Sequence, residues 1–312
     1  YGGQGGFGNA ASATDDVAYD SAFWPTDPGS AGGCGTASYP SNFGGGAIYL
    51  VIADTLTNNG IISAHGQTAQ GTEAYIGGGA GGSILVQTRL LAGSGQFSAN
   101  GGHGGHTSYS GGGAGGRVAI YYDTSSFSGY SSSTVNGGLG YRNGQPGTMA
   151  VVNNGDLYVD QYLLLSETTT TFNNVIVRNG ATLIVTNGAV LNVTNALLVS
   201  SNAVVQVSGD ARLDAQRAEL SAAARMIIVG GSLFNVAGHL RLLGSNTMIV
   251  CQGKNVATTN ALGQWVGEGV VISASNLFVD IGARINADGG GYLTGGSLQD
   301  GKGPGGGKRS PG

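Results

Sequence analysis

The acidic residues near the start of the chain have the types and spacing that could bind a metal ion. Asp15, Asp16, Asp20 and Asp27 fall within one loop-like segment, TDDVAYDSAFWPTDPGS. Carboxylate-rich loops can hold Ca²⁺, although this spacing is neither that of an EF-hand nor that of the nonapeptide calcium repeats. The same segment carries Trp24, which could stack on a sugar ring or cap a local core. The sequence therefore offers Ca²⁺ as a candidate ligand and predicts no other cofactor.

A second group of charged residues could perform acid–base chemistry on a polysaccharide, because such sites need clustered carboxylates. Its members are Arg212, Asp214, Arg217, Glu219 and Arg225. The strand pattern described below places Asp214 and Glu219 on different faces and so separates the two carboxylates around a corner. A ladder of surface ion pairs is the expectation, and the chain is predicted not to be an enzyme.

Two of the four histidines, His103 and His106, lie in the segment GGHGGHTS. A zinc site would need further ligands, and neither a Cys-x-x-Cys nor a His-Glu-x-x-His motif accompanies them. We expect exposed loop histidines rather than a metal site.

The elements that must position these residues repeat every 22 residues in the middle of the chain. Strand-like pieces of one series begin at Ala181, Ala203, Arg225 and Thr247, with two further pieces in each interval. The pieces are rich in Val, Ile and Thr, and Asn or Gly recurs at their junctions, which favours strands over a coiled coil. Three short strands per repeat predict an all-β, three-sided solenoid, a right-handed parallel β-helix.

Alternation along these strands assigns their faces. One face is predicted to bury Leu183, Val205, Ile227 and Ile249, and beside them Val185, Val207, Val229 and Cys251. Cys251 is therefore expected to be a buried free thiol. The outward positions of this face are mostly apolar and mark a packing surface, covered either by the glycine-rich part of the chain or by another subunit. Its exposed apolar residues are predicted to be Ile184, Val204, Met226, Ile228, Met248 and Val250.

Glycine divides the chain into three predicted segments. Segment 1–147 holds glycine-rich rungs with long loops, 148–267 holds the regular 22-residue rungs, and 268–312 holds a final rung and a glycine-rich tail. In the first segment the runs Gly77–Gly79 and Gly111–Gly113 recur with a period of 33 to 36 residues. We expect these runs to stack in polyglycine-II-like layers, since only glycine lets backbone approach backbone so closely; flexible loops are the alternative.

Composition narrows the range of partners. Charged residues make up 10% of the 312 residues and the net charge is −4, which excludes the basic footprint of a nucleic-acid-binding protein. No apolar run reaches the length of a membrane span. Many small polar residues and few lysines indicate an extracellular or cell-surface protein.

Several segments resemble a known group of proteins. GGGAGGSILV, GGGAGGRVAIYY and ATLIVTNGAVLNVTNALLVSSNAVVQV are similar to the glycine-rich repeat regions of very large bacterial surface proteins with parallel β-helix architecture. The resemblance implies a cell-surface or extracellular location and no particular chemistry. In such proteins a rung ending in a glycine-rich stretch runs on into a YGGQGG-like start.

The two ends of the chain fit this arrangement, because Gly312 followed by Tyr1 would read as one uninterrupted rung. The sequence therefore predicts a structural subunit or tandem repeat of an extracellular filament or stalk, joined head to tail to further copies of itself. A surface adhesin that binds extracellular polysaccharide is the alternative, and a polysaccharide lyase or hydrolase is the second. The residues expected at the junction are Tyr1, Gly2, Gly3, Gly305, Gly306, Gly307 and Gly312.

Overall fold

The computed structural model of the protein describes residue 6 and residues 19–34, 42–69, 75–166, 169–294 and 299–308. Every regular element in these ranges is a β-strand, and none is a helix. Most of the described strand pairs are parallel, and β6 with β7 is antiparallel, so the prediction of an all-β chain of mostly parallel strands is confirmed. The chain forms two compact units, Tyr1–Leu164 and Leu165–Gly312, which are described separately.

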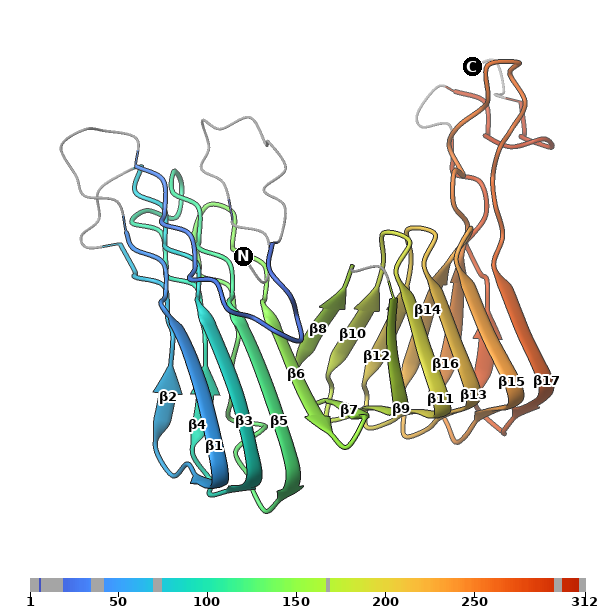
Figure 1. Cartoon of the computed structure of the whole chain (residues 1–312). Helices are drawn as coiled ribbons and strands as arrows, with labels where there is room; N and C mark the ends of the chain where they lie inside the picture. The colour runs from blue at the N-terminus through green and yellow to red at the C-terminus, as the bar shows by residue number, and fades with distance from the viewer. Residues whose placement is uncertain are drawn as a thin grey trace. The chain divides into compact units, whose positions relative to one another are not determined.

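The first unit is built on a parallel sheet whose strands lie side by side (Figure 1). Its strands are, in spatial order, β1 (Ala47–Thr57), β3 (Ser83–Ala92), β5 (Arg117–Ser125) and β6 (Thr148–Asn153). The short strands β2 (Ile61–Ser63) and β4 (Gln96–Ser98) form a second sheet. β6 turns back into β7 (Asp156–Val159) through Asn154 and Gly155, whose φ angles of 48° and 85° make the tight turn of the antiparallel pair. β8 (Tyr162–Leu165) ends at the boundary of the units.

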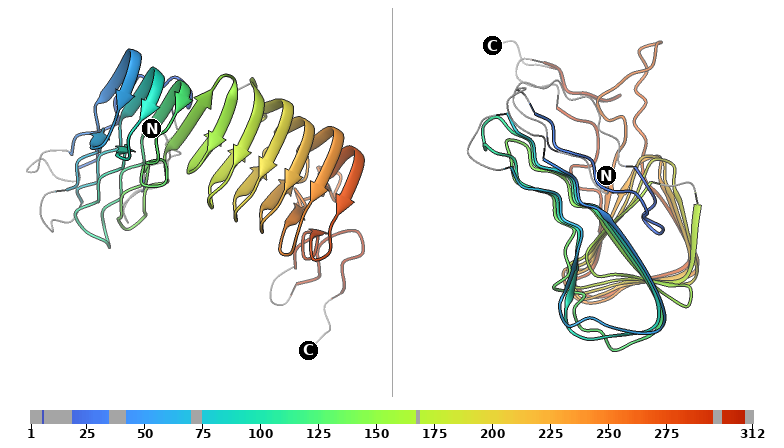
Figure 2. Two further views of the ribbon diagram at one scale, coloured as in Figure 1. Left: turned by 90° about the horizontal axis from the view of Figure 1, so that it is seen from below. Right: turned by 60° about the vertical axis from the view of Figure 1, so that its left-hand side comes forward.

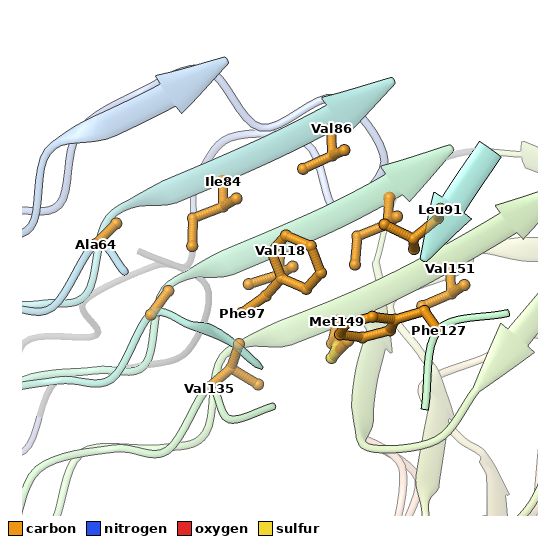
Figure 3. Packing of buried hydrophobic residues seen from close by; sticks show 12 residues of the cluster. Ala64, Ile84, Val86, Leu91, Phe97, Val118, Phe127, Val135, Met149 and Val151 are labelled. Carbon is orange, nitrogen blue, oxygen red and sulfur yellow. The ribbon is translucent and has the colours of Figure 1, made fainter. Parts of the chain in front are cut away.

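The core of the first unit lies between its two sheets (Figure 3). Successive strands place equivalent side chains in columns: Ile84 pairs with Val118, and Val118 with Met149. Phe97 of β4 packs against Phe127, with ring centroids 5.4 Å apart. All five side chains are almost fully buried, so the side chains of each strand shield those of the neighbouring strand from water.

The glycine-rich runs of the first unit are packed against one another without side chains between them. Backbone hydrogen bonds link consecutive segments in a chain: Gly102 donates to Gly79, Gly113 to Gly102 and Gly138 to Gly113, at 2.7–2.9 Å. A Cβ atom on Gly113 would lie 2.0 Å from the Gly79 carbonyl oxygen, and one on Gly112 would lie 2.0 Å from that of Gly138. Ordered packing, rather than flexible loops, therefore accounts for these glycines.

The second unit also has two sheets of parallel strands, and Figure 2 shows its successive turns overlying one another. One sheet contains β9 (Thr169–Val177), β11 (Val190–Val199), β13 (Arg212–Leu220), β15 (Leu233–Leu242) and β17 (Val271–Val279). The other contains β10 (Thr182–Val185), β12 (Val204–Val207), β14 (Arg225–Val229), β16 (Met248–Gln252) and β18 (Arg284–Asn286). Leu191, Leu213 and Phe234 are buried neighbours in one column, and Val193, Ala215 and Val236 are buried neighbours in another.

The tight turns that lead into β10, β11, β12, β13 and β14 have a shared form that explains the recurring Asn, Gly and Ala. Two residues adopt left-handed φ angles, and a buried alanine follows, whose amide hydrogen-bonds back across the turn. Asn and Gly tolerate this conformation best. The left-handed pairs are Asn179–Gly180, Asn187–Gly188, Ser201–Asn202, Gly209–Asp210 and Ala222–Ala223.

Each repeat of about 22 residues in the second unit, called a turn of the chain from here on, contains two strands. The sequence suggests three separate pieces instead. The long strands pass the remaining corner without a break, and only the pairing register shifts there, as between Val193 and Ala196 of β11. The corner residues of β11, Thr194 and Asn195, are exposed. This corner needs no left-handed residue, so the strand continues through it.

The length of that corner corrects the predicted faces of β14. Two residues separate Val193 from Ala196 in β11, whereas Gln216 alone separates their partners in β13. Val205 therefore pairs with Met226, and Val207 with Ile228. Met226 and Ile228 are fully buried, so their predicted exposure is wrong. Ile227 and Val229, which were expected inside, are the half-buried outward residues.

Cys251 also departs from its predicted place in the core. It pairs with the buried Ile228, but the pairing of β16 with β18 ends one residue earlier, at Val250 and Asn286. Cys251 is therefore half-buried rather than buried, and this partial burial raises the pKa of its thiol. Cys251 is a free thiol.

Candidate functional site

The last turn of the second unit leaves its core columns uncovered on one side. Leu277 of β17 pairs with Leu240 and Val279 with Leu242, while Ile285 of β18 pairs with Ile249. The three inner partners are 0% exposed, but Leu277 is 54%, Val279 41% and Ile285 40% exposed. In the described part of the chain no strand pairs with the outer edge of β17. This end combines apolar side chains with an open strand edge, which is a template for further pairing.

The first strands of the first unit form a second open edge. Ile48 and Leu50 of β1 lie beside the fully buried Ile84 and Val86, yet both stay only half-buried. β1 has one sheet neighbour, β3, among the described residues. Its other side therefore offers unpaired backbone groups next to incompletely covered apolar side chains.

The remaining residues of the predicted apolar face lie on the outer sides of β10, β12 and β16. Ile184, Val204, Met248 and Val250 are each half-buried. Ile227 takes the outward place predicted for Met226 and Ile228. The apolar columns are interrupted, because Gln206 pairs between Ile184 and Ile227, and Arg225 pairs between Val204 and Met248. The two predicted explanations, cover by the glycine-rich part or by another subunit, both stay predictions.

The predicted junction residues are only partly described. Tyr1, Gly2, Gly3 and Gly312 lie outside the described residues. Gly305, Gly306 and Gly307 belong to a tail segment that folds back on itself, since Gly306 donates a hydrogen bond to Gly303 and Gly301 donates one to Gly307. A Cβ atom on Gly305 or Gly307 would meet open space, so the described packing does not require glycine there.

Of the candidate calcium ligands, Asp15 and Asp16 lie outside the described residues. The carboxylate of Asp20 organises its own loop: it accepts hydrogen bonds from the backbone amides of Ser21, Thr26 and Asp27 at 2.8–3.2 Å. No group of three or more potential metal ligands exists among the described residues. The loop is therefore ordered by a side-chain-to-backbone network centred on Asp20.

The charged cluster of β13 forms ion pairs along the surface. Arg212 contacts Asp214 at 2.7 Å, and Glu219 pairs with Arg241 of the next strand at 3.2 Å. The register shift of β13 lies between Asp214 and Glu219. Both carboxylates are thus engaged with arginines on either side of the corner, which matches the expected ladder.

Two histidines of the first unit, His65 and His103, bond successive glycine-rich segments to each other, whereas His106 accepts the amide of Ser108 within its own loop. His65 Nδ1 accepts the backbone N–H of Asn100 at 3.0 Å, and His103 Nδ1 accepts that of Leu139 at 2.7 Å. Asn100 Oδ1 in turn accepts the amide of Asn136 at 2.8 Å. Sequence reasoning missed this role, although the spacing of about one rung between His65 and Asn100 is its signal.

An aromatic patch lies on the outer face of the first unit's sheet. Trp24 contacts Tyr49 and Tyr121, with ring centroids 5.9 Å and 6.0 Å apart. Beside these rings runs a groove of about 460 Å³, which we call the β1–β6 groove; its walls include Val51, Gln87, Arg89, Tyr121, Asp123 and Asn154. The sequence singled out Trp24 but not Tyr49 or Tyr121, whose outward places follow from strand alternation.

The chain matches no known protein family, and no curated protein or solved structure is similar to it. The described residues also contain no helix that is long and apolar enough to span a membrane. The function must therefore be inferred from the open ends, the glycine layer and the surface features of the chain itself.

Proposed function

We propose that the protein is a structural subunit or tandem repeat of an extracellular filament or surface stalk, built on a right-handed parallel β-helix. The β-helix is supported by the pairing of each strand with the equivalent strand one turn later, as in β10, β12, β14 and β16. The handedness follows from the strong preference of parallel crossovers for the right hand. Such a rod buries its core by stacking turns and can be extended indefinitely.

The glycine-rich runs would form the stiff side of this rod. Their mutual hydrogen bonds and the absence of room for Cβ atoms resemble the packing of polyglycine II, in which extended chains bond to several neighbours. Removing every side chain from this layer brings backbone groups together and satisfies them without water. We infer a structural role for this layer rather than a catalytic one.

The exposure of Leu277, Val279 and Ile285 is the observation that carries the assembly proposal. These residues continue columns that are sealed in every preceding turn, and a further turn would bury them at a gain of about 25 cal/mol per Å² of apolar surface. The opposite edge, β1, offers Ile48 and Leu50 in the same incomplete state. We propose that β17 and β18 of one copy of the protein stack on β1 and β2 of the next copy.

The strand layout of the two ends supports this pairing. β1 and β2 are a long strand and a three-residue strand joined by Asn58–Gly60, and β17 and β18 repeat that layout across Asp280–Ala283. The short strands β2 and β18 are both followed by Ala, then His or Asp, and then Gly. These residues are Ala64–Gly66 and Ala287–Gly289. The last turn therefore has the form of the glycine-rich turns and can be continued by one of them.

Electron microscopy and sedimentation of the purified chain test this proposal. We expect concentration-dependent rods or filaments, since a heterologous contact that does not close generates linear polymers. Strictly monomeric behaviour of the folded chain at millimolar concentration would refute end-to-end assembly of separate subunits. In that case two copies joined in tandem as one polypeptide should unfold at a higher temperature than one copy, because covalently joined repeats would seal the same surface.

A further inference from the structure

The loop that carries Trp24 is fastened rigidly to the sheet beneath it. The guanidinium group of Arg117, a residue only 5% exposed, donates two hydrogen bonds to the Tyr19 carbonyl at 3.1 Å and 3.2 Å. Ser83 donates to the Asp27 carbonyl at 2.6 Å, and the Tyr121 hydroxyl donates to the Phe23 carbonyl at 2.6 Å. Trp24 is therefore held in place before any ligand arrives, which lowers the entropy cost of binding.

The loop covers the sheet without burying its own tryptophan. Leu85 and Ala119 point to this outer face and are 0% exposed, so the core beneath the loop is already sealed. Trp24 nevertheless remains 46% exposed and Tyr49 51% exposed. Capping of a local core accounts for the covered residues but leaves the exposed aromatic surface unexplained. Clustered exposed aromatic rings beside a groove are the mark of a ligand site.

Polar groups along the β1–β6 groove complement the rings. The Tyr49 hydroxyl donates to Gln87 Oε1 at 3.0 Å, which fixes the amide and directs its donor capacity to a ligand. Asp123 lines the groove as an acceptor. Sugar hydroxyls need both donors and acceptors, while the C–H face of a pyranose packs on an aromatic ring. The groove volume of about 460 Å³ lies in the range of ordinary ligand sites.

The charges of the groove indicate which polysaccharides it can bind. Arg89 is its positive group, and its Nε donates to Asp54 at 2.7 Å, so the guanidinium already has a carboxylate partner. Asp123 adds a further negative charge. An anionic chain would meet repulsion without an uncommitted cation, whereas a neutral chain meets none.

We propose that the β1–β6 groove and the ring pair of Trp24 and Tyr49 bind a segment of a neutral polysaccharide. A pyranose ring stacks on the aromatic pair, and the hydroxyls of the following sugars hydrogen-bond to Gln87 and Asp123. This site lies on the outer face of the sheet and does not depend on end-to-end assembly. A filament that carried it would bear one glycan-binding site per subunit.

Binding of defined hexasaccharides by the full chain tests the site. The chain has two tryptophans, so in the Trp265→Phe variant the emission reports on Trp24 alone. Titration with cello-, laminari-, manno- and chitohexaose should shift this emission for at least one sugar, with a Kd between micromolar and millimolar. Isothermal calorimetry of the unmodified chain should give the same Kd. If none of the four sugars binds at about 10 mM, which is ten times a Kd of about 1 mM, the proposal is overturned.

Matched variants separate the site from general effects. Trp24→Ala and Tyr49→Ala should each weaken binding by about tenfold or more, whereas Trp265→Phe should leave it unchanged. Gln87→Ala tests the groove without touching the loop, in case Trp24→Ala unfolds it, and should also weaken binding. If the Tyr49→Ala and Gln87→Ala variants bind the sugar as tightly as the parent chain, the proposal is overturned. So would binding of dextran sulfate without any neutral sugar, or a loss of self-association in Trp24→Ala with no sugar bound by the parent chain.

Discussion

Leu277 lies directly opposite Leu240 in the parallel pairing of β15 with β17, yet Leu240 is fully buried and Leu277 is 54% exposed. The two side chains are chemically identical and occupy one column of the core. Their difference arises because Leu240 has a neighbouring strand on both sides, whereas Leu277 has one on a single side among the described residues. The column thus continues to a surface that another turn of chain can complete.

Replacing Leu277 by Glu should block end-to-end assembly and leave the fold intact. A buried carboxylate at the junction would lack a partner and would cost several kcal/mol, while in the free chain it remains in contact with water. Sedimentation should show loss of oligomers, and the circular dichroism spectrum should be unchanged. Leu262→Glu is the matched control, because Leu262 is 83% exposed in a loop outside the columns. Equal loss of assembly in both variants would contradict a specific junction at β17.

Gly112→Ala should destabilise the first unit by about 1–3 kcal/mol, because its new methyl group would overlap the Gly138 carbonyl oxygen. Gly46→Ala offers a control within a similar glycine run, since a Cβ atom there would meet nothing within 4 Å. Urea unfolding followed by tyrosine fluorescence measures both. A neutral result for Gly112→Ala would show that the glycine layer is loosely packed.

Two adjacent residues of β14 should respond differently to truncation. Met226→Ala should lower the free energy of unfolding by about 2–5 kcal/mol, because Met226 is fully buried. Ile227→Ala should cost about 1 kcal/mol or less, because Ile227 points outward and is half-buried. Thermal unfolding of the two variants tests the 21-residue spacing between Val205 and Met226. A larger loss of stability in Ile227→Ala than in Met226→Ala would contradict this spacing and support a uniform spacing of 22 residues.

Ser232→Ala should stabilise the second unit by about 1–2 kcal/mol. Ser232 is 1% exposed and follows Ala189 and Ala211 in its column, and its hydroxyl has no hydrogen-bond partner among the described residues. Thr247 provides the contrast: its buried hydroxyl donates to the Leu243 carbonyl at 2.8 Å. Thr247→Ala should therefore be destabilising in the same urea titration, and a gain of stability there would refute this explanation.

Mild acid should loosen the glycine-rich segments around His65. Burial lowers the pKa of His65, and its neutral Nδ1 accepts the Asn100 amide. A folded-state pKa below the unfolded value of about 6.5 means that this contribution is complete above that pH and is lost as the pH falls through the folded pKa. After correction for its intrinsic pH dependence, hydrogen exchange at Asn100 should be several-fold faster at pH 5 than at pH 7.5. His65→Gln should remove this pH effect, and its persistence would contradict the assignment.

The sequence determined the features that depend on local pattern. Period-2 alternation within short Val- and Ile-rich pieces placed Leu183, Val205 and Leu213 in the core, and the structure agrees. Asn–Gly pairs marked the turns, because few other residues adopt left-handed φ angles at low cost. The recurrence of glycine runs indicated close backbone packing, and the positions of the Gly102 and Gly138 carbonyls show that packing.

The tertiary structure alone decided register and exposure. One residue fewer at a corner of β13 shifts β14 and exchanges Met226 with Ile227, and a side-chain pattern of period 2 cannot reveal a one-residue change in a segment apolar on both faces. Trp24, Tyr49 and Tyr121 come from distant parts of the chain and meet only because β1, β3 and β5 lie side by side. Likewise, the amino-acid sequence around Leu277 and Leu240 does not show that one is exposed and the other buried. Burial depends on what packs against a residue, and that is settled by the arrangement of strands in space.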